Sequence, residues 1–250
     1  GIIYWWLTGA NGGGINVSTP VEIKDMLLYE PESGAVDALR PVAHWKLDEG
    51  SGTVATDSSE YGRDGTLLNG VAWGNDATRG TYAQFDGINN RILTPFLYAI
   101  SAGDEFTWAW WANQGSGNST GAIMVGNRYP QGAPGEEFEF IKMMAHETQF
   151  ANTDVAGAIE KYNYTDLPTD QWHHYAMVKT GGSYQWYVDG VAQGSPQAFV
   201  YNESAPIPFL IGGDDDGTGT KVNEHFEGCI DDVVLYQRET NFQILNSPAL

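Results

Sequence analysis

The 250-residue sequence contains a single cysteine, Cys229, which excludes an intrachain disulfide and a cysteine-ligated metal cluster. It also lacks long apolar runs. The longest run near the start, residues 2–7, is far short of the ~20 apolar residues that span a bilayer. We therefore expect no insertion into a membrane.

Basic residues are scarce. Lys and Arg number 12 against 32 Asp and Glu, so the formal net charge is −20. A nucleic-acid partner would require a basic surface that replaces counterions, so the composition argues against one. It also disfavours affinity for an anionic membrane surface. Strong acidity with few lysines is compatible with an extracellular or cell-surface location, which we expect here.

Amphipathic helical patterns are nearly absent, because no long segment places apolar residues at the i, i+3, i+4, i+7 spacing. Turn residues separate short runs rich in β-branched and aromatic residues. Gly181-Gly182 and Asp189-Gly190 are typical of two-residue hairpin turns. These features predict an all-β fold, a two-sheet antiparallel jelly-roll sandwich. The expected strands include residues 106–112, 137–144, 173–179, 184–189, 208–211 and 230–236.

The sequence contains one internal repeat, formed by residues 6–29 and 209–236. Each copy has an apolar pair, a Gly-rich loop and a strand with the pattern Ile-x-Asp, two apolar residues, Leu-Tyr. Either residues 1–29 are the closing hairpin of a preceding similar sandwich or an added edge hairpin, or the likeness is a chance match of two amphipathic strands. Residues 30–41 are charged and flanked by proline, which is typical of a linker. We expect the main domain at residues 42–240 and a C-terminal tail at 241–250.

From His44 onward, an ordered set of motifs resembles the laminin-G-like branch of the concanavalin A-like lectin/glucanase superfamily. The motifs include HWKLDEGSG at 44–52, DSSEYGRDGT at 57–66, FTWAWW at 106–111, WYVDG at 186–190 and GCIDDV at 228–233. The resemblance implies the jelly-roll fold. It leaves function open, because this fold carries lectins, adhesion modules, glycoside hydrolases and plain spacers.

A catalytic pair of carboxylates is not evident. Retaining glycosidases need two carboxyl groups about 5–5.5 Å apart. The resemblance implies that an enzyme of this fold would carry a Glu-x-Asp-x-x-Glu strand. The nearest candidate, Glu137 and Glu139, lacks the central Asp and the distal Glu. We therefore predict that the protein is not an enzyme.

Acidic clusters suggest a structural calcium ion, which takes six to eight oxygen ligands. Neighbouring first and last strands would bring two of the clusters together, and the glucanases that the chain resembles often hold calcium at the corresponding places. The alternative is that the Asp57–Asp64 loop is braced by Asx-turn hydrogen bonds without metal. The candidate ligands are Asp48, Glu49, Asp57, Asp64, Asp231 and Asp232.

Strand alternation separates the tryptophans of residues 106–112. Trp108 and Trp110 share one face and Trp111 lies on the other. The resemblance implies that the face of Trp108 is the core face, which leaves Trp111 on the second sheet face. A glycan would stack on aromatic rings there, with amides reading its hydroxyls. The candidate ligand-binding residues are Trp111, Asn113, Gln185 and Tyr187, with Tyr129 at the rim; the alternative is that they pack beneath loops.

These observations favour a non-catalytic extracellular carbohydrate-binding or adhesion module of a larger secreted or surface protein. A neutral glycan is the expected partner, because the acidic chain would repel sulfated or uronate glycans. The main alternative is a structural repeat domain of a filament, sheath or surface layer, assembling with neighbouring copies by strand complementation. A glycoside hydrolase or lyase is the third hypothesis, and it lacks the carboxylate pattern.

Overall fold

The structure is a computed structural model, which describes residues 40–98, 101–118, 122–128, 139–144, 147–152, 159–163, 169–199, 207–213 and 224–238. Several predictions fall outside these residues. They concern residues 1–29, nearly all of the 30–41 linker, Tyr129, Glu137 and the 241–250 tail.

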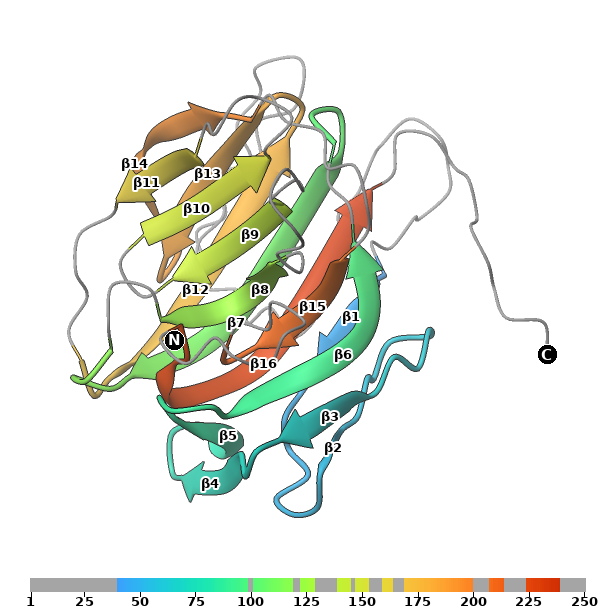
Figure 1. The fold of residues 1–250 in the computed structure, drawn as a ribbon, viewed down its shortest axis with the longest axis vertical. Coiled ribbons are helices and arrows are strands. Elements are labelled where there is room, and N and C mark those ends of the chain that lie inside the picture. The colour runs from blue at the N-terminus through green and yellow to red at the C-terminus, as the bar shows by residue number, and fades with distance from the viewer. Residues whose placement is uncertain are drawn as a thin grey trace, which may run out of the picture.

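Two antiparallel β-sheets pack face to face (Figure 1), as the sequence predicted. The described residues contain no helix, and hence none that is long and apolar enough to cross a membrane. The first sheet, sheet I, has the order β14 (Val191–Ala198), β13 (Ser183–Val188), β12 (Trp172–Thr180), β7 (Glu105–Gln114), β16 (Glu227–Arg238), β5 (Gly80–Asp86) and β4 (Ala72–Asp76), with β1 (Ala43–Trp45) also paired with β16.

Sheet II covers one face of sheet I. Its order is β11 (Ile159–Asn163), β10 (Glu147–Asn152), β9 (Glu139–Met144), β8 (Ile123–Arg128), β15 (Ile207–Ile211), β6 (Arg91–Tyr98), β3 (Gly65–Leu68) and β2 (Val54–Ala55).

The predicted hairpin turns are confirmed. Gly181 and Gly182 join β12 to β13, and Asp189 and Gly190 join β13 to β14. Asp189 and Gly190 have φ angles of 49° and 76°. Both residues therefore adopt the left-handed backbone conformation that the tight turns favoured in hairpins require. Local sequence therefore determines the two turns that connect β12, β13 and β14.

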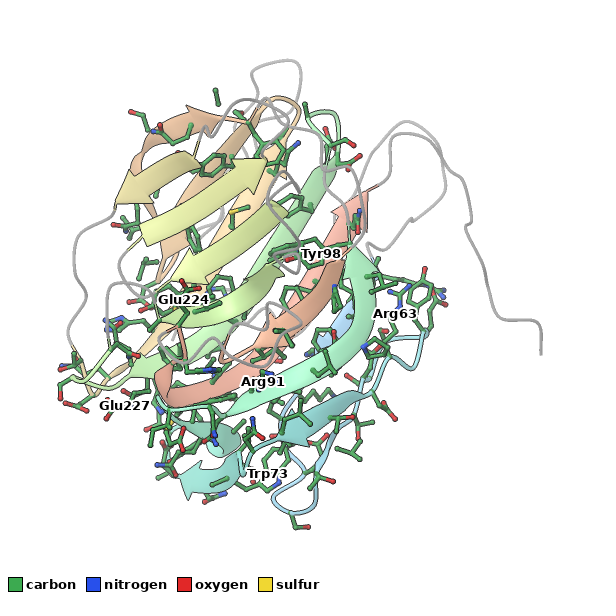
Figure 2. All side chains as sticks on the ribbon, in the orientation of Figure 1. Arg63, Trp73, Arg91, Tyr98, Glu224 and Glu227 are labelled. Atoms are coloured by element: carbon green, nitrogen blue, oxygen red, sulfur yellow. The ribbon has the colours of Figure 1, made fainter. Side chains whose placement is uncertain are left out.

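Large aromatic side chains fill the space between the sheets. Phe209 of β15 stacks on Trp45 of β1 at a centroid distance of 5.7 Å and meets Trp108 of β7 edge-on at 5.2 Å. Tyr98 of β6 (Figure 2) also meets Trp108 edge-on at 5.2 Å. Each such ring removes roughly 200 Å² from water, so these contacts across the sandwich hold the two sheets together.

β15 is an interior strand of sheet II, and β16 is an interior strand of sheet I. β15 lies between β8 and β6, and β16 lies between β7 and β5 and also pairs with β1. The register of β16 against β7 shifts between Asp231 and Val234, and Asp232 in this bulge has a φ of 53°. A bulge re-aims the side chains around it, and this one lies in the middle of sheet I.

Candidate functional site

The predicted division of the tryptophans on β7 is confirmed. Trp108 and Trp110 are 2% and 0% exposed and belong to the core, whereas Trp111 is half-buried on the opposite face of the strand. We call this opposite face, which points away from sheet II, the outer face of sheet I. It carries Tyr82, Ala109, Trp111, Trp172, His174, Ala176, Gln185, Tyr187, Asp231, Val234 and Tyr236.

Trp111 lies at the centre of this outer face. The strand register places it opposite His174 on β12 and opposite Asp231 on β16. The His174 ring meets the indole edge-on, with centroids 5.2 Å apart. An aromatic ring, an imidazole and a carboxylate thus lie in one row across three adjacent strands.

The turn between β4 and β5 brings Arg79 to the same row. Asp76 shapes this turn by accepting hydrogen bonds from the backbone N–H groups of Thr78 and Arg79 at 2.7 and 2.8 Å. Arg79 Nε then donates to Asp231 Oδ2 at 2.7 Å, and the guanidinium carbon lies 4.4 Å from the centroid of the Trp111 ring. One face of the indole is therefore occupied by a cation.

A second contact fastens the β4–β5 turn to sheet I. Trp172 Nε1 donates to Asp76 Oδ2 at 2.9 Å, and the Trp172 ring meets Tyr82 edge-on at 5.2 Å. Tyr82 is on β5 and Trp172 on β12, with β16 and β7 between them in the sheet. The two rings therefore meet above these central strands and cover part of the outer face.

Burial shifts the pKa of two groups in the Trp111 row. It raises the pKa of Asp231 to about 7, against the lowering effect of Arg79. Burial lowers the pKa of His174 to about 4, against the raising effects of Asp232 and Asp189. The Nδ1 atom of His174 is buried without a hydrogen-bond partner. His174 is consequently a neutral imidazole at physiological pH.

The structure brings some of the predicted ligand-binding residues together. Trp111, Gln185 and Tyr187 all lie half-buried on the outer face, as predicted. The amide nitrogen of Gln185 donates to the carbonyl oxygens of Trp186 and Gln193, both at 3.0 Å.

Asn113 lies at the end of the outer face where the aromatic rings of Tyr82 and Trp172 meet. The register places it opposite Trp172 on β12 and Cys229 on β16. Asn113 is therefore two positions along β7 from Trp111, on the same face. Gln185 and Tyr187 lie on β13, beyond β12, so the predicted residues form two groups rather than one cluster.

Sequence reasoning missed Arg79, His174 as a neighbour of Trp111, and Tyr236 on β16. The pattern Asp-x-Thr-Arg-Gly at 76–80 signals a tight turn. It does not reveal that the turn lies against β7 and β16. That placement depends on contacts such as Arg79 with Asp231, which are 152 residues apart.

Asp57, one of the predicted metal ligands, organises a loop. Its Oδ1 accepts from the backbone N–H groups of His44 and Ser59 at 2.8 and 2.9 Å. Its Oδ2 accepts from Ser59 Oγ and from the backbone N–H of Arg63, both at 2.8 Å. Asp64 supports the same loop by accepting from the backbone N–H of Asp57 at 2.8 Å. The Asx-type hydrogen bonds that the sequence predicts for this loop are therefore present.

The side chain of Arg63 secures this loop to the rest of the domain (Figure 2). Its Nη1 donates to the carbonyl oxygen of Val42 at 2.6 Å, and its guanidinium lies 5.0 Å from the Phe96 ring centroid. The loop that carries two of the predicted calcium ligands is thus held by the protein's own donors.

The remaining candidate ligands lie near the junction of β1 and β16, which are neighbours as predicted. Asp231 is paired with Arg79, and Asp232 Oδ1 lies 2.7 Å from His44 Nε2. Asp48 is exposed, and Glu49 Oε1 accepts from the backbone N–H of Thr56 at 2.7 Å. Among the described residues, no three His, Cys, Asp or Glu side chains are grouped so that they could hold a metal ion. Calcium binding therefore stays a prediction.

The sequence and the sandwich agree with a known family. The family model described as the concanavalin A-like lectin/glucanases superfamily, a laminin-G type, matches residues 80–243. The chain belongs to this superfamily. No curated protein has a significant sequence match to the chain.

Solved structures share the fold at low identity. Domain 4 of a GH43 extracellular arabinanase from Geobacillus stearothermophilus, in complex with arabinotriose, is 19% identical with a TM-score of 0.53, over 79% of this chain and 92% of that chain. The ligand-binding domain of botulinum neurotoxin serotype D, in complex with N-acetylneuraminic acid, is 11% identical with a TM-score of 0.55, over 81% and 48%. A sialidase from Trypanosoma rangeli is 17% identical with a TM-score of 0.55, over 90% and 34%. The chain thus spans about half of the toxin domain and a third of the sialidase.

Proposed function

We propose that this protein is a non-catalytic, extracellular carbohydrate-binding module whose binding surface is the outer face of sheet I. The observation that carries the proposal is the concentration of half-buried aromatic side chains on this one face. Protein surfaces rarely gather aromatic rings without a partner, and sugars stack on such rings through their C–H groups. The rings belong to Tyr82, Trp111, Trp172, Tyr187 and Tyr236.

Trp111 is covered on one face by Arg79, and Tyr82 and Trp172 contact each other. These two contacts involve neither Tyr187 on β13 nor Tyr236 on β16. Tyr187 and Tyr236 are three strand spacings apart across the sheet, about 14 Å, and two residues apart along the strands, about 7 Å. We assign them as the stacking platforms of the site.

Small side chains separate the two platforms. The register places Ala176 of β12 beside Tyr187 and Ala109 of β7 beside Ala176, followed by Val234 of β16. These small residues form a row across the sheet next to Trp111 and His174. An oligosaccharide lying across the strands would pass over this row from Tyr187 toward Tyr236.

The state of the carboxylates supports a non-catalytic role. A glycosidase needs two carboxyl groups that reach the scissile bond. Asp231 is only 3% exposed and is held by Arg79, while Asp232 is held by His44. With a net charge of −20, the protein favours a neutral glycan over an acidic one.

The fold neighbours support the carbohydrate-binding part of this proposal. One was solved with arabinotriose and another with N-acetylneuraminic acid, and the first is a domain of an extracellular enzyme. A module that delivers a larger protein to such a glycan would act outside the cell, where the acidic composition of this chain suits it.

A glycan array followed by titration calorimetry tests the proposal. The array should include arabinotriose, other neutral oligosaccharides and sialylated glycans, and we expect binding to a neutral one. Tyr187→Ala and Tyr236→Ala should each weaken that binding about tenfold, which corresponds to about 1.4 kcal/mol. Tyr61→Ala is the matched control, because Tyr61 is 51% exposed in the distant 57–64 loop.

Two results would overturn the proposal. Absence of binding to every glycan on the array would remove the function. Binding that survives both Tyr187→Ala and Tyr236→Ala but is lost in Tyr61→Ala would move the site away from the outer face of sheet I.

A further inference from the structure

The side-chain amide of Gln185 is held in one orientation on the outer face of sheet I. Gln185 is half-buried on β13, two positions before Tyr187 and on the same face of the strand. Its Nε2 donates to the carbonyl oxygens of Trp186 and Gln193, both at 3.0 Å. A carbonyl oxygen accepts hydrogen bonds and never donates them, so only the nitrogen of the amide can face these two groups. Both amide hydrogens are therefore used by the protein itself.

An irregularity in β14 explains why this amide is needed. Two steps along β13, between Tyr184 and Trp186, match four steps along β14. Pro196 lies in this bulge of β14 and has no N–H group to donate. The Gln185 amide supplies donors at the point where the regular pairing of the two strands is interrupted. Its Oε1 accepts no hydrogen bond from the described residues and is not buried. Gln185 thus presents a fixed acceptor to the solvent.

A fixed acceptor selects the chemical group that binds to it. A sugar hydroxyl can donate to Oε1, whereas an ionised carboxylate or a sulfate only accepts. Because the bonds to β13 and β14 already hold the amide, a ligand does not have to order this side chain. The Gln185 side of the outer face therefore favours hydroxyl groups and disfavours acidic groups.

Arg79 is the opposite case, a fixed donor. Its Nε and Nη2 lie 2.7 and 2.6 Å from Asp231 Oδ2, and its guanidinium lies over the Trp111 ring. Its Nη1 makes no hydrogen bond with the described residues and is not buried. A guanidinium nitrogen donates and never accepts. Because Asp231 compensates the charge of Arg79, Nη1 offers hydrogen bonds without adding a net positive charge to the surface.

The strand register places these two groups on opposite sides of the row of small residues. Gln185 pairs with Val178, two positions after Ala176 on β12. Trp111, with the guanidinium above it, pairs with His174, two positions before Ala176. A glycan that passes over Ala176 therefore has the acceptor on one side and the donor on the other.

The distance between the two groups sets the length of glycan that reaches both. Gln185 is on β13 and Trp111 is on β7, with β12 between them. Their strands are thus about 10 Å apart. A ring in an extended sugar chain advances the chain by about 5 Å, which is close to the spacing of neighbouring strands. Three consecutive rings cover β13, β12 and β7, whereas two rings reach only one of the two groups.

We infer that the outer face of sheet I binds a neutral oligosaccharide of at least three rings through this acceptor and this donor. A hydroxyl of the ring over β13 donates to Gln185 Oε1, and an oxygen of the ring over β7 accepts from Arg79 Nη1. The inference rests on the proposed glycan-binding function. It adds the residues that determine specificity, the group each of them binds and the shortest ligand that engages both.

Titration calorimetry of the full chain tests the inference with arabinotriose, cellotriose, xylotriose and mannotriose and with the disaccharide of each. We expect a trisaccharide that binds to do so about tenfold more tightly than its disaccharide, because only the longer chain reaches both groups. Gln185→Met removes the acceptor. Arg79→Lys keeps a cation beside Asp231 but lacks the second donor nitrogen. We expect each variant to weaken trisaccharide binding about fivefold.

Two matched substitutions serve as controls and should bind like the wild type. Gln197→Met changes a glutamine whose amide also donates to a backbone carbonyl, that of Ser195 at 2.8 Å. Gln197 pairs with the buried Tyr184, so it lies on the opposite face of sheet I from Gln185. Arg40→Lys changes an arginine that is 71% exposed and pairs with Glu60.

Monofluorinated trisaccharides separate a lost hydrogen bond from a general loosening of β14. Fluorine in place of a hydroxyl removes the proton that the ligand donates. One such derivative should bind the wild type about fivefold more weakly than its parent sugar and bind Gln185→Met as well as the parent does. Equal losses in both proteins for every derivative would show that Gln185 acts only on the fold of β14, which overturns its assignment.

The remaining outcomes distinguish the inference from the proposed function. If Gln185→Met and Arg79→Lys bind like the wild type while Tyr187→Ala does not, the inference is wrong and the glycan-binding proposal stays. Tightest binding to a uronate or sulfated glycan, or to none of the four trisaccharides while another glycan binds, also overturns the inference alone. A glycan array without any binding removes both proposals.

Discussion

Arg79 and Asp231 are 152 residues apart in the sequence, yet Nε and Nη2 of Arg79 lie 2.7 and 2.6 Å from the same oxygen, Asp231 Oδ2. Asp231 is nearly fully buried and the Arg79 side chain is 19% exposed. The pair joins the β4–β5 turn to the central strand of sheet I. It also fixes the guanidinium on the face of Trp111.

Removing one partner of this pair should be costly, because the other is left without its counter-charge. We expect Asp231→Leu to lower the free energy of unfolding by about 3 kcal/mol. The double variant Arg79→Met, Asp231→Leu should cost clearly less than the sum of the two single changes. Urea unfolding of all four proteins provides the double-mutant cycle, and strict additivity would contradict the coupling.

The chain offers an exposed ion pair as a control for this cycle. Arg40 and Glu60 are 2.9 Å apart, with side chains 71% and 49% exposed. We expect Arg40→Ala to change the free energy of unfolding by less than about 1 kcal/mol.

The pKa of His174, lowered to about 4 by burial, predicts a specific pH dependence. Between pH 6.5 and pH 4 the unfolded chain binds a proton at this residue and the folded protein does not. This group therefore contributes stability that is present above pH 6.5 and is lost as the pH falls toward 4, by about 3 kcal/mol in total.

Comparison with His174→Gln isolates this contribution. Asp231, whose pKa is raised to about 7, changes the stability in the opposite direction over this pH range. The pH dependence of the wild type alone therefore does not isolate the contribution of either group. We expect the stability advantage of wild type over His174→Gln to shrink steadily from pH 6.5 to pH 4 in urea titrations. An advantage that stays constant over this range would show that His174 titrates normally in the folded protein.

Asp57 should be the residue most sensitive to substitution in the 57–64 loop. Asp57→Ala leaves three backbone N–H groups without their acceptor, those of His44, Ser59 and Arg63. We expect it to lower the free energy of unfolding by roughly 3 kcal/mol. Asp48→Asn is the control, because Asp48 is an exposed carboxylate on the neighbouring segment. Similar losses in both variants would contradict the bracing role.

The calcium hypothesis makes a separate prediction. If Asp48 and Glu49 hold a calcium ion, millimolar calcium raises the Tm relative to EDTA, and Glu49→Gln removes that increase. The loss of stability in Asp57→Ala should be the same in both buffers, because its carboxylate is already saturated by protein donors. Equal Tm values for wild type with calcium and with EDTA would exclude the ion as a stabilising ligand.

The sequence predicts local features of this protein well. Alternation along 106–112 separates Trp108 from Trp111, and glycine placement locates the turns at 181–182 and 189–190. The signals are local because side-chain direction and turn geometry depend on residues within two or three positions.

The constellation around Trp111 depends on long-range register, which no local signal determines. His174 faces Trp111 because β12 pairs with β7 in one particular register, and the bulge at Asp232 re-aims its neighbour Asp231. Arg79 arrives from a turn that a single sequence cannot place on either face of the sheet. The same limitation applies to the six proposed calcium ligands, because their positions relative to one another depend on the pairing of β1 with β16.

The interior position of β16 has a consequence for biosynthesis. Without residues 227–238, β7, β5 and β1 lose the strand with which all three pair, so sheet I is divided into three parts that share no strand pairing. A ribosome releases these residues only after it has made almost everything else in the domain. In the nascent chain, these parts of sheet I therefore stay unjoined until β16 has emerged from the exit tunnel.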